Sequence, residues 1–339
     1  MTDNNDLKII IVLFNSSNLI FKCLEQLKNF KIIIVDNGKN EHLLKKIRLF
    51  SNIEKIVTKN KNIGFGNAVN FAFEKINTKF FLILNPDIIL DEASILALLK
   101  TMKENTNCAI ASPFVPTDKD SYGNFPEKGK GVPRNKFQQN CSKTLENIKP
   151  EGNLCVDVAK GCSLLINTEH FKNIGMFNQK YFLFWEEIDL CKKFREKKLS
   201  VIINPNSIGA HEQGNSTKND LLSFITRVYH SELSPLIYFN VRKLSPTIYW
   251  KMIKYIFRTL SYIFIFNFKK SFMNLLKFLA TLNYIFFIAV AFRNTFLFIY
   301  YTEFEAIYLI LNYYGFGWVL PRRNIVIIFW GHKHLHDLL

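Results

Sequence analysis

Three carboxylates stand within four positions of one another in the segment Phe182–Cys191, directly after a run of aromatic residues. Like charges this close repel, and a carboxylate beside aromatic walls is expected to have a raised pKa, which suits a general base. If a helix starts near Glu186, then Glu186 and Asp189 share one face and Glu187 lies about 100° away. The alternative is an acidic first turn favoured by the helix dipole, which does not call for the aromatic approach.

A second acidic candidate follows Phe80–Leu84, where five apolar residues predict a strand buried on both faces. Asn85 and Asp87 come at its carboxyl end, and Pro86 between them stiffens the turn. Ligands of open α/β sheets bind outside the carboxyl ends of the strands, so Asp87 is a candidate ligand for a divalent ion. Its alternative role is to cap the helix that begins near Asp91.

His211 is the candidate second metal ligand. It follows another predicted strand, Val201–Ile203, which we expect Asn204-Pro205 to end. A lone histidine is more often structural than a ligand. A metal bound to a diphosphate needs several hard ligands, so the hypothesis requires Asp87 and His211 to lie together.

Polar residues also follow the first two strands predicted along the chain. Asn15 follows the first, and Asp36 and Asn37 follow the second. If these strands neighbour the one that leads to Asp87, all the polar ends converge on one edge, where a nucleotide fits. Asp36 can accept hydrogen bonds from a pyrimidine base or a ribose, although Asp36-Asn37-Gly38 also fits a type I′ hairpin turn.

The segment 62–70, NIGFGNAVN, places two glycines before a predicted helix. Gly64 and Gly66 let the backbone approach a ligand, and the helix offers N–H groups to a diphosphate. It is not the dinucleotide fingerprint, because Val69 stands where a third Gly or Ala belongs. A flexible loop is the alternative interpretation.

Alternating strand and helix patterns position these side chains. Short connections between them predict an α/β fold with a parallel sheet, helices on both faces and right-handed crossovers. Val115–Gly152 loses this periodicity and is interpreted as a long mobile insertion near the acceptor. The predicted strands are Lys8–Phe14, Lys31–Val35, Ile53–Thr58, Phe80–Leu84, Cys108–Phe114 and Lys160–Ile166, and the predicted helices include 18–30, Glu41–Phe50, Asn67–Ile76 and Asp91–Lys103.

The composition limits the class of protein. The chain has 339 residues, 48% of them hydrophobic, so disorder is excluded as a description of the whole. The net charge of +16 suggests an anionic partner: nucleic acid, anionic lipid or a phosphorylated substrate. The six cysteines form no C-x-x-C pair, which favours reduced thiols. MTDNNDLK has no apolar signal core, so we expect the catalytic half to stay inside the cell.

The last third of the sequence carries much of the charge. Leu233–Thr302 contains no acidic residue and nine basic ones. Two sets of residues share helical faces: Lys251, Lys254 and Arg258 on one, and Trp250, Ile253 and Phe257 on the other. This pattern is typical of a helix lying in an anionic membrane surface, which we favour over a span because Asn294–Gly315, though long, carries two glutamates. A helical subdomain packed on the sheet, or a dimer contact, is the alternative.

The motifs together resemble the family 2 glycosyltransferases of GT-A fold, most of all their rhamnosyltransferase-like branch. The resemblance covers about residues 7–217 and depends on motif order and spacing: FN at Phe14-Asn15, VDNG at Val35–Gly38, the segment 62–70, NPD at Asn85–Asp87, KGCSLLI at Lys160–Ile166, FLFWEEIDLC at Phe182–Cys191 and the segment from His211 to Ser216. It implies a Rossmann-like, mixed but mainly parallel sheet and an inverting sugar transfer from a nucleotide diphosphate donor, assisted by Mg²⁺ or Mn²⁺.

The resemblance also implies roles for single residues. Asp36 would contact the base, and Asp87, at the end of a DxD-like motif, would hold the metal with His211. The family's base is usually the Asp of a Glu-Asp pair, a position that Glu187 occupies here; Glu186 and Asp189 are the other candidates. The extra methylene displaces a carboxylate enough to cost about 10²-fold in rate unless the pocket compensates. We predict these donor-binding residues: Asn15, Asp36, Asn37, Asn62, Gly64, Phe65, Asn85 and Gly161.

The predicted organisation is a catalytic domain, residues 1–217, followed by a helical membrane-associating region, residues 218–339. The Q-x-x-R-W motif of processive synthases is absent, so we expect transfer of a single sugar, from dTDP-rhamnose or a UDP-hexose, to a lipid-linked or glycan acceptor. The expected place is the cytoplasmic face of the inner membrane, in assembly of lipopolysaccharide, capsule or cell wall polysaccharide, with homo-oligomerisation left open. The competing classes are a non-catalytic nucleotide-sugar-binding or scaffold protein and, less favoured, a basic nucleic-acid-binding protein.

Overall fold

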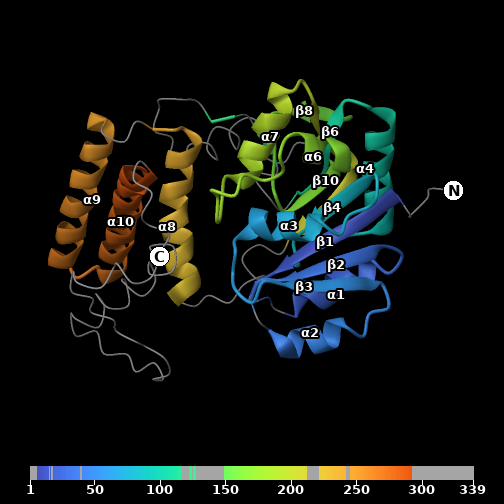
Figure 1. Ribbon diagram of the computed structural model, residues 1–339, viewed down its shortest axis with the longest axis horizontal. Helices are drawn as coiled ribbons and strands as arrows, with labels where there is room; N and C mark the ends of the chain where they lie inside the picture. The colour runs from blue at the N-terminus through green and yellow to red at the C-terminus, as the bar shows by residue number, and fades with distance from the viewer. Residues whose placement is uncertain are drawn as a thin grey trace, which may run out of the picture. The chain divides into compact units, whose positions relative to one another are not determined.

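The computed structural model describes residues 6–14, 16, 18–38, 40–116, 122–123, 125–126, 149–211, 221–241 and 245–291 (Figure 1). Several predicted features lie outside the described residues: Asn15, Ser216, residues 117–121 and 127–148 of the insertion, and everything from 292 onward. The contacts define one compact unit, Met1–Phe286, and a second, Phe287–Leu339. The domain boundary at residue 217 stays a prediction.

Nine strands of the described part form one mixed sheet. Its order is β3-β2-β1-β4-β10-β6-β11-β5, and β8 pairs with β11. The strands β3, β2, β1 and β4 run parallel, while β10 is antiparallel to both β4 and β6. The bounds are β1 Leu7–Leu13, β2 Lys31–Asp36, β3 Ile53–Thr58, β4 Phe80–Leu84, β5 Ile88–Leu90, β6 Cys108–Phe114, β8 Leu154–Val156, β10 Ser163–Asn167 and β11 Ser200–His211, with β7 Tyr122–Gly123 and β9 Val158–Ala159 as a separate pair.

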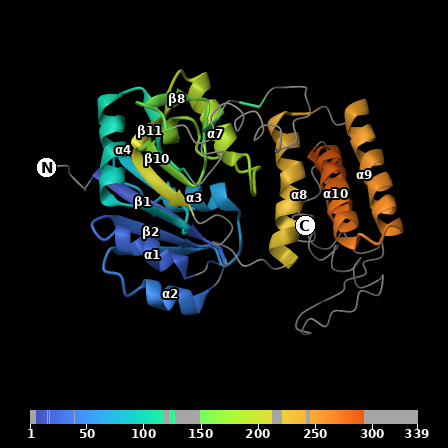
Figure 2. The same cartoon turned by 180° about the vertical axis from the view of Figure 1, so that it is seen from behind.

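Helices cover both faces of the sheet because its central strands are apolar on both sides. Along β1, Ile9 and Ile11 enter one core and Ile10 and Val12 the other, as period-two alternation requires. The helices of the first core are α1 Leu19–Gln26, α2 Glu41–Ile47 and α4 Glu92–Glu104, and those of the second are α3 Phe65–Phe73, α6 Thr168–Asn173 and α7 Glu186–Glu196 (Figures 1 and 2). Each fully buried Ile or Leu contributes roughly 1.5–3 kcal/mol of transfer free energy, so the continuous apolar strands stabilise the sheet at its centre.

The parallel strands β2, β1 and β4 are neighbours, so their carboxyl ends meet at one edge of the sheet. Leu13 of β1 pairs with Asp36 of β2, and Ile11 pairs with Leu84 of β4. The polar residues after β2 and β4 therefore gather as the sequence pattern predicted. The α/β class, the mixed sheet and the placement of helices on both faces are confirmed.

The prediction that Asn204-Pro205 ends a short strand is wrong. Strand β11 runs from Ser200 to His211, and its register against β6 shifts between Asn204 and Ile208. A proline lacks the N–H that a regular ladder needs, and this irregular stretch accommodates it without ending the strand. Beyond the shift, β11 pairs with β5, and His211 comes opposite Ile88.

Three helices follow the sheet: α8 Leu221–Tyr238, α9 Pro246–Phe264 and α10 Phe268–Ala291. Buried Glu232 of α8 joins the first two, because it accepts hydrogen bonds from Lys251 Nζ at 2.9 Å and from Tyr255 Oη at 2.6 Å. Tyr284 of α10 donates to the carbonyl of Val241. Among the helices that the structure describes, none combines the length and the apolarity needed to cross a bilayer.

Candidate active site

Asp87 and His211 lie side by side at the carboxyl edge of the sheet. Asp87 follows β4 and precedes β5, and the pairing of β5 with the end of β11 brings His211 Nε2 to 3.4 Å from Asp87 Oδ1. Both side chains are largely buried, with exposed fractions of 2% for Asp87 and 9% for His211. The two candidate metal ligands, distant in sequence, thus share one location.

The chemistry of this pair fits a divalent cation. Within the described residues, Asp87 Oδ1 is buried and accepts no hydrogen bond, an arrangement that is costly for a carboxylate unless a positive charge approaches it. No group of three or more His, Cys, Asp or Glu side chains suited to a metal occurs in that part of the chain. Mg²⁺ and similar ions are often held by one or two protein ligands with substrate phosphates and water as the rest, which matches a two-residue site.

The loop after β3 is fastened to the end of β2 by a single amide. Asn37 Nδ2 donates to Asn62 Oδ1 at 2.8 Å and to the carbonyl of Gly64 at 3.3 Å, while Asn37 Oδ1 accepts from Ile63 N–H at 3.0 Å. Asn37 is 4% exposed, so its side chain holds the loop in place. Beside it, Asp36 Oδ1 accepts from Gly38 N–H at 3.1 Å. Donor contact by these residues stays a prediction.

Gly64 is where this loop meets the aromatic-acidic segment. Its φ is +84°, and a Cβ added there would lie 2.3 Å from the carbonyl oxygen of Phe182. The next residue, Phe65, donates its backbone N–H to that same oxygen at 3.1 Å. Helix α3 begins at Phe65, two residues earlier than predicted, so this N–H of its first turn is bonded to protein.

The aromatic approach to α7 is a strained turn. Phe184 and Trp185 both have left-handed backbones, with φ values of 66° and 71°, which non-glycine residues adopt rarely and at a cost. Trp185 is buried and serves as the N-cap residue of α7, so the three carboxylates follow in the first turn as predicted. Such strain is maintained only where surrounding contacts hold it.

Glu187 lies against Gly161, two residues before β10. A Cβ built on Gly161 would be 3.4 Å from the Cβ of Glu187 and 3.8 Å from its carboxyl carbon. The adjacent carbonyl, that of Cys162, accepts from Asn85 N–H at 2.9 Å. Residues 161 and 162 thus link Glu187 to the turn that carries Asp87.

The carboxylate of Asp189 contacts Tyr181 and Lys193, not Gly161. Its Oδ1 accepts from Tyr181 Oη at 3.4 Å, and its Oδ2 lies 3.5 Å from Lys193 Nζ. Burial raises the pKa of Asp189, and Lys193 opposes that shift. Glu186 is 6% exposed. Burial raises the pKa of Tyr181, the negative charge of Asp189 adds to this shift, and Glu186 makes the smallest contribution. Of the three carboxylates, Glu187 is the one that packs on Gly161, next to the residue that bonds to the turn carrying Asp87.

Helix α8 supports the strained turn, a role that sequence patterns did not indicate. Ser234 Oγ donates to the carbonyl of Leu183 at 2.8 Å, and His230 stacks on Phe182 with ring centroids 4.8 Å apart. Trp185 contacts two further aromatic rings at 5.1 and 5.5 Å, those of Tyr238 and Phe239. No motif marks these residues, because ordinary helical residues acquire this role only through packing.

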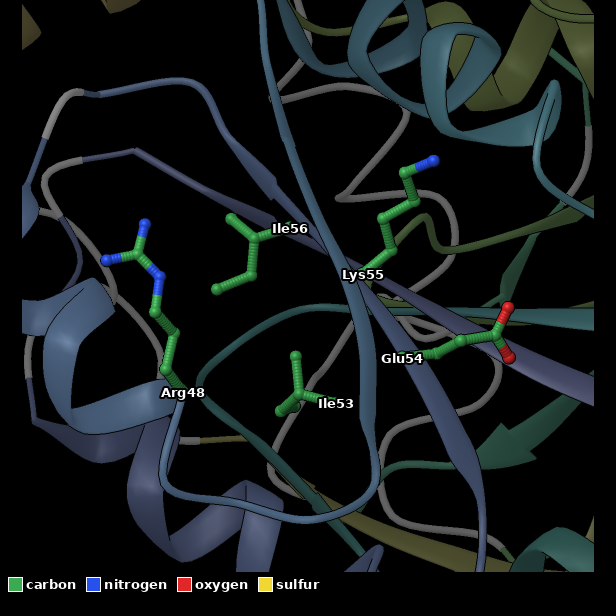
Figure 3. A pocket seen from close by; sticks show the side chains of 5 residues that line it. All are labelled: Arg48, Ile53, Glu54, Lys55 and Ile56. Atoms are coloured by element: carbon green, nitrogen blue, oxygen red, sulfur yellow. The ribbon is translucent and has the colours of Figure 1, made fainter.

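A shallow hollow of about 300 Å³ lies away from this edge of the sheet. It is lined by Arg48, which caps the end of α2, and by Ile53–Ile56 of the edge strand β3 (Figure 3). Glu54 there is paired with Lys8 Nζ at 2.6 Å. The hollow is at the opposite end of the strand from Thr58, which pairs with Asp36, so we do not connect it with the candidate site.

Comparison with known proteins shows the fold and a family match over part of the chain. The sequence model of the family described as Glycosyl transferase family 2 matches residues 8–165. The structure of GalNAc-T7 with UDP, GalNAc and Mn²⁺ superposes with a TM-score of 0.50 at 12% identity, covering 69% of this chain and 51% of that one. This likeness concerns the fold.

Curated relatives match at modest identity. The low-salt glycan biosynthesis hexosyltransferase Agl10 of Haloferax volcanii is 25% identical over 210 residues, which cover 58% of this chain and 64% of that protein. The rhamnosyltransferase WbbL of Escherichia coli (strain K12) is 28% identical over 201 residues, 54% of this chain and 74% of that protein. The N-acetylglucosaminyl-diphospho-decaprenol L-rhamnosyltransferase of Mycobacterium tuberculosis is 21% identical over 225 residues, 59% of this chain and 72% of that protein. Residues 8–165 therefore form a glycosyl transferase family 2 domain, set in a sheet of GT-A fold.

Proposed function

We propose that this chain transfers one sugar, with inversion, from a nucleotide diphosphate donor to a lipid-linked or glycan acceptor in bacterial surface polysaccharide synthesis. The observation that carries the proposal is the buried pair Asp87 and His211, placed at the strand edge that also carries Asp36. The relatives named as rhamnosyltransferases support dTDP-rhamnose, and the one named as a hexosyltransferase supports a UDP-hexose. The mycobacterial relative is named for a sugar linked through diphosphate to decaprenol, which supports a lipid-linked acceptor.

In this proposal each residue of the site has one role. Asp87 and His211 would hold Mg²⁺ or Mn²⁺, and the ion would supply positive charge against the leaving diphosphate. Asp36 accepts hydrogen bonds from the base or ribose. Glu187 takes the proton of the acceptor hydroxyl as that oxygen bonds to the anomeric carbon and the bond from this carbon to the diphosphate oxygen breaks.

The donor class is tested by thermal stabilisation. A panel of nucleotide sugars with and without Mn²⁺ is expected to raise the melting temperature most for one donor, and only with the metal. Asp87→Asn should remove the metal-dependent increase and donor turnover. Asp91→Asn is the matched control, since Asp91 caps α4 by accepting from Ser94 N–H and Asn caps equally well. An unchanged metal response in Asp87→Asn would refute the metal assignment.

The identity of the base is tested by two isosteric variants. Glu187→Gln is expected to retain the donor-induced thermal shift and to lose about 10²-fold or more in transfer rate, because proton removal is lost while the packing on Gly161 remains. Asp189→Asn should keep most of the activity. Equal losses in both variants, or an active Glu187→Gln, would contradict the assignment. Donor binding without any transfer in the wild type would instead favour a non-catalytic binding protein.

The proposed location is the cytoplasmic face of the inner membrane, with the chain attached peripherally. The basic and aromatic helices that follow the sheet support this placement. Membrane and cytosolic fractions of cells that express the full chain, washed with high salt, test it. Recovery only in the cytosol at low salt would argue against it.

A further inference from the structure

Helix α9 presents an apolar face that no described part of the chain covers. We call it the outer face of α9, and it consists of Trp250, Ile253, Phe257, Leu260 and Phe264. These side chains are 55–89% exposed, and their spacing places them along one side of the helix over roughly 21 Å. The opposite side packs inward, where Ile248 is fully buried and Tyr255 is 8% exposed. A single large exposed apolar strip of this kind marks an interaction surface.

The turn between α9 and α10 extends this apolar surface. Ile265, Phe266 and Phe268 are 57–81% exposed. The turn has a defined shape, since Phe266 has a left-handed backbone with φ of 54° and the N–H groups of Phe266 and Asn267 donate to carbonyls of α9. Aromatic side chains are therefore displayed at the end of the helix on an ordered turn.

The charged residues that α9 and α10 themselves contribute beside this surface are all positive. Lys254 and Arg258 of α9 and Lys269 and Lys270 of α10 are exposed, and residues 246–291 contain no Asp or Glu. Lys251, predicted to share the basic face, instead bonds to Glu232 of α8 at 2.9 Å. The charge available at the surface is thus that of the remaining basic residues.

An exposed apolar face flanked by positive charges favours an anionic membrane surface over other binding partners. A second copy of the chain would bring the same positive charges against themselves, which opposes a symmetric contact. Nucleic acid would be recognised by stacking aromatics in a charged groove, whereas Ile253 and Leu260 stand between the aromatic residues here. Apolar residues on one side with Lys and Arg on the flanks suit a helix lying in the interface of a bilayer rich in anionic headgroups.

We propose that the outer face of α9 and the α9–α10 turn bind the surface of an anionic membrane, with α9 lying in the plane of the interface. Glu232 connects α9 to α8, and α8 bonds to the turn that leads into the acidic helix. Membrane contact would therefore be made by an element joined through α8 to the catalytic segment. The inference deepens the proposed function, and it is tested by binding alone.

The experiment is sedimentation of the full chain with vesicles, without donor or acceptor. Vesicles of phosphatidylcholine containing about one third phosphatidylglycerol are expected to bind the wild type, and pure phosphatidylcholine vesicles to bind it at least about tenfold more weakly. The double variant Phe257→Glu with Phe264→Glu should lose about tenfold or more, because apolar insertion is lost. Leu49→Glu is the matched control, since Leu49 is 83% exposed on a different part of the chain.

A second pair of variants tests the charge. Lys254→Glu with Arg258→Glu is expected to weaken binding to the anionic vesicles by about tenfold or more, while Lys45→Glu with Lys46→Glu, the same change on exposed positions of α2, leaves it near that of the wild type. Circular dichroism checks that the variants fold. Equal binding to both vesicle types, or full binding by the Phe257 and Phe264 variant, would overturn the proposal. The proposal would also be overturned if the wild type were a dimer and the Phe257 and Phe264 variant were a monomer. Because no turnover is measured, failure here leaves the transfer reaction open.

Discussion

Gly64 combines two separate requirements for glycine at one position. Its φ of +84° is a conformation that residues with a Cβ rarely adopt, and the carbonyl of Phe182 lies too close to the position that a Cβ would take. The contact joins the loop after β3 to the segment that leads into α7. A single residue thus holds the predicted donor loop and the predicted base in one arrangement.

Three glycine variants separate these requirements. Gly64→Ala is expected to destabilise the fold by about 2 kcal/mol or more and to abolish the donor-induced thermal shift, because both the strain and the overlap appear. Gly175→Ala shares the positive φ, 81°, but meets no atom within 4 Å, so it should cost only about 1 kcal/mol and keep donor binding.

Gly152→Ala completes the series, since no atom lies within 4 Å of its Cβ position. It should behave as the wild type. Denaturant unfolding and the thermal shift with donor and Mn²⁺ measure both quantities. Equal behaviour of the Gly64 and Gly175 variants would show that the contact with Phe182 has no role in shaping the site.

At the scale of elements, helix α8 maintains the strained turn at Phe184 and Trp185. We expect Ser234→Ala to lower kcat several-fold with little change in the donor KM, because the hydrogen bond to Leu183 positions the acidic helix and does not contact the donor. The stability loss should be about 1 kcal/mol.

Ser261→Ala is the matched control for this prediction. Ser261 Oγ donates to the carbonyl of Phe257 at the same 2.8 Å, but within α9. Its removal should leave kcat unchanged, and Ser234→Thr, which keeps a hydroxyl, should restore part of the activity. A Ser234→Ala enzyme with normal kcat and lowered stability would assign Ser234 a structural role alone.

His230 gives the same helix a dependence on pH. Burial lowers the pKa of His230 from 6.5 to about 4. The folded protein then binds this proton less tightly than the unfolded chain, so stability is full above about pH 6.5 and falls as the pH drops toward 4, by about 1–3 kcal/mol. His230→Phe keeps a ring against Phe182 and should flatten this part of the curve. Urea unfolding at several pH values measures it, with the exposed His42→Gln as control; identical curves for wild type and His230→Phe would contradict the prediction.

At the scale of the molecule, the sheet and the described helices as far as Phe286 share one compact unit. The ring of Trp185 contacts Tyr238 and Phe239, and Glu232 joins α8 to α9. A fragment that ends at residue 217 should therefore unfold at lower temperature and lose the donor-induced shift, whereas a fragment that ends at residue 291 should keep both. A 1–217 fragment with the melting temperature and donor response of the longer one would instead support an independent domain boundary at 217.

The sequence by itself determined the class of the fold and the residue types of the site. Short continuous apolar runs bounded by turn residues, such as Phe80–Leu84 before Asn85-Pro86, favour strands buried on both faces. The polar residues after such strands gather at one edge when the strands are parallel neighbours. Local patterns also marked Asp87 and Glu187, since short motifs carry their own turn and helix signals.

Only the tertiary structure decided how these residues meet. The irregular passage of β11 through Pro205 brings His211 to Asp87, although Asn204-Pro205 reads locally as a stop. The support of Phe182 and Leu183 by His230 and Ser234 has no sequence signal. Strand register and helix packing are set by the summed contacts of distant segments, and no local pattern of residues contains that sum.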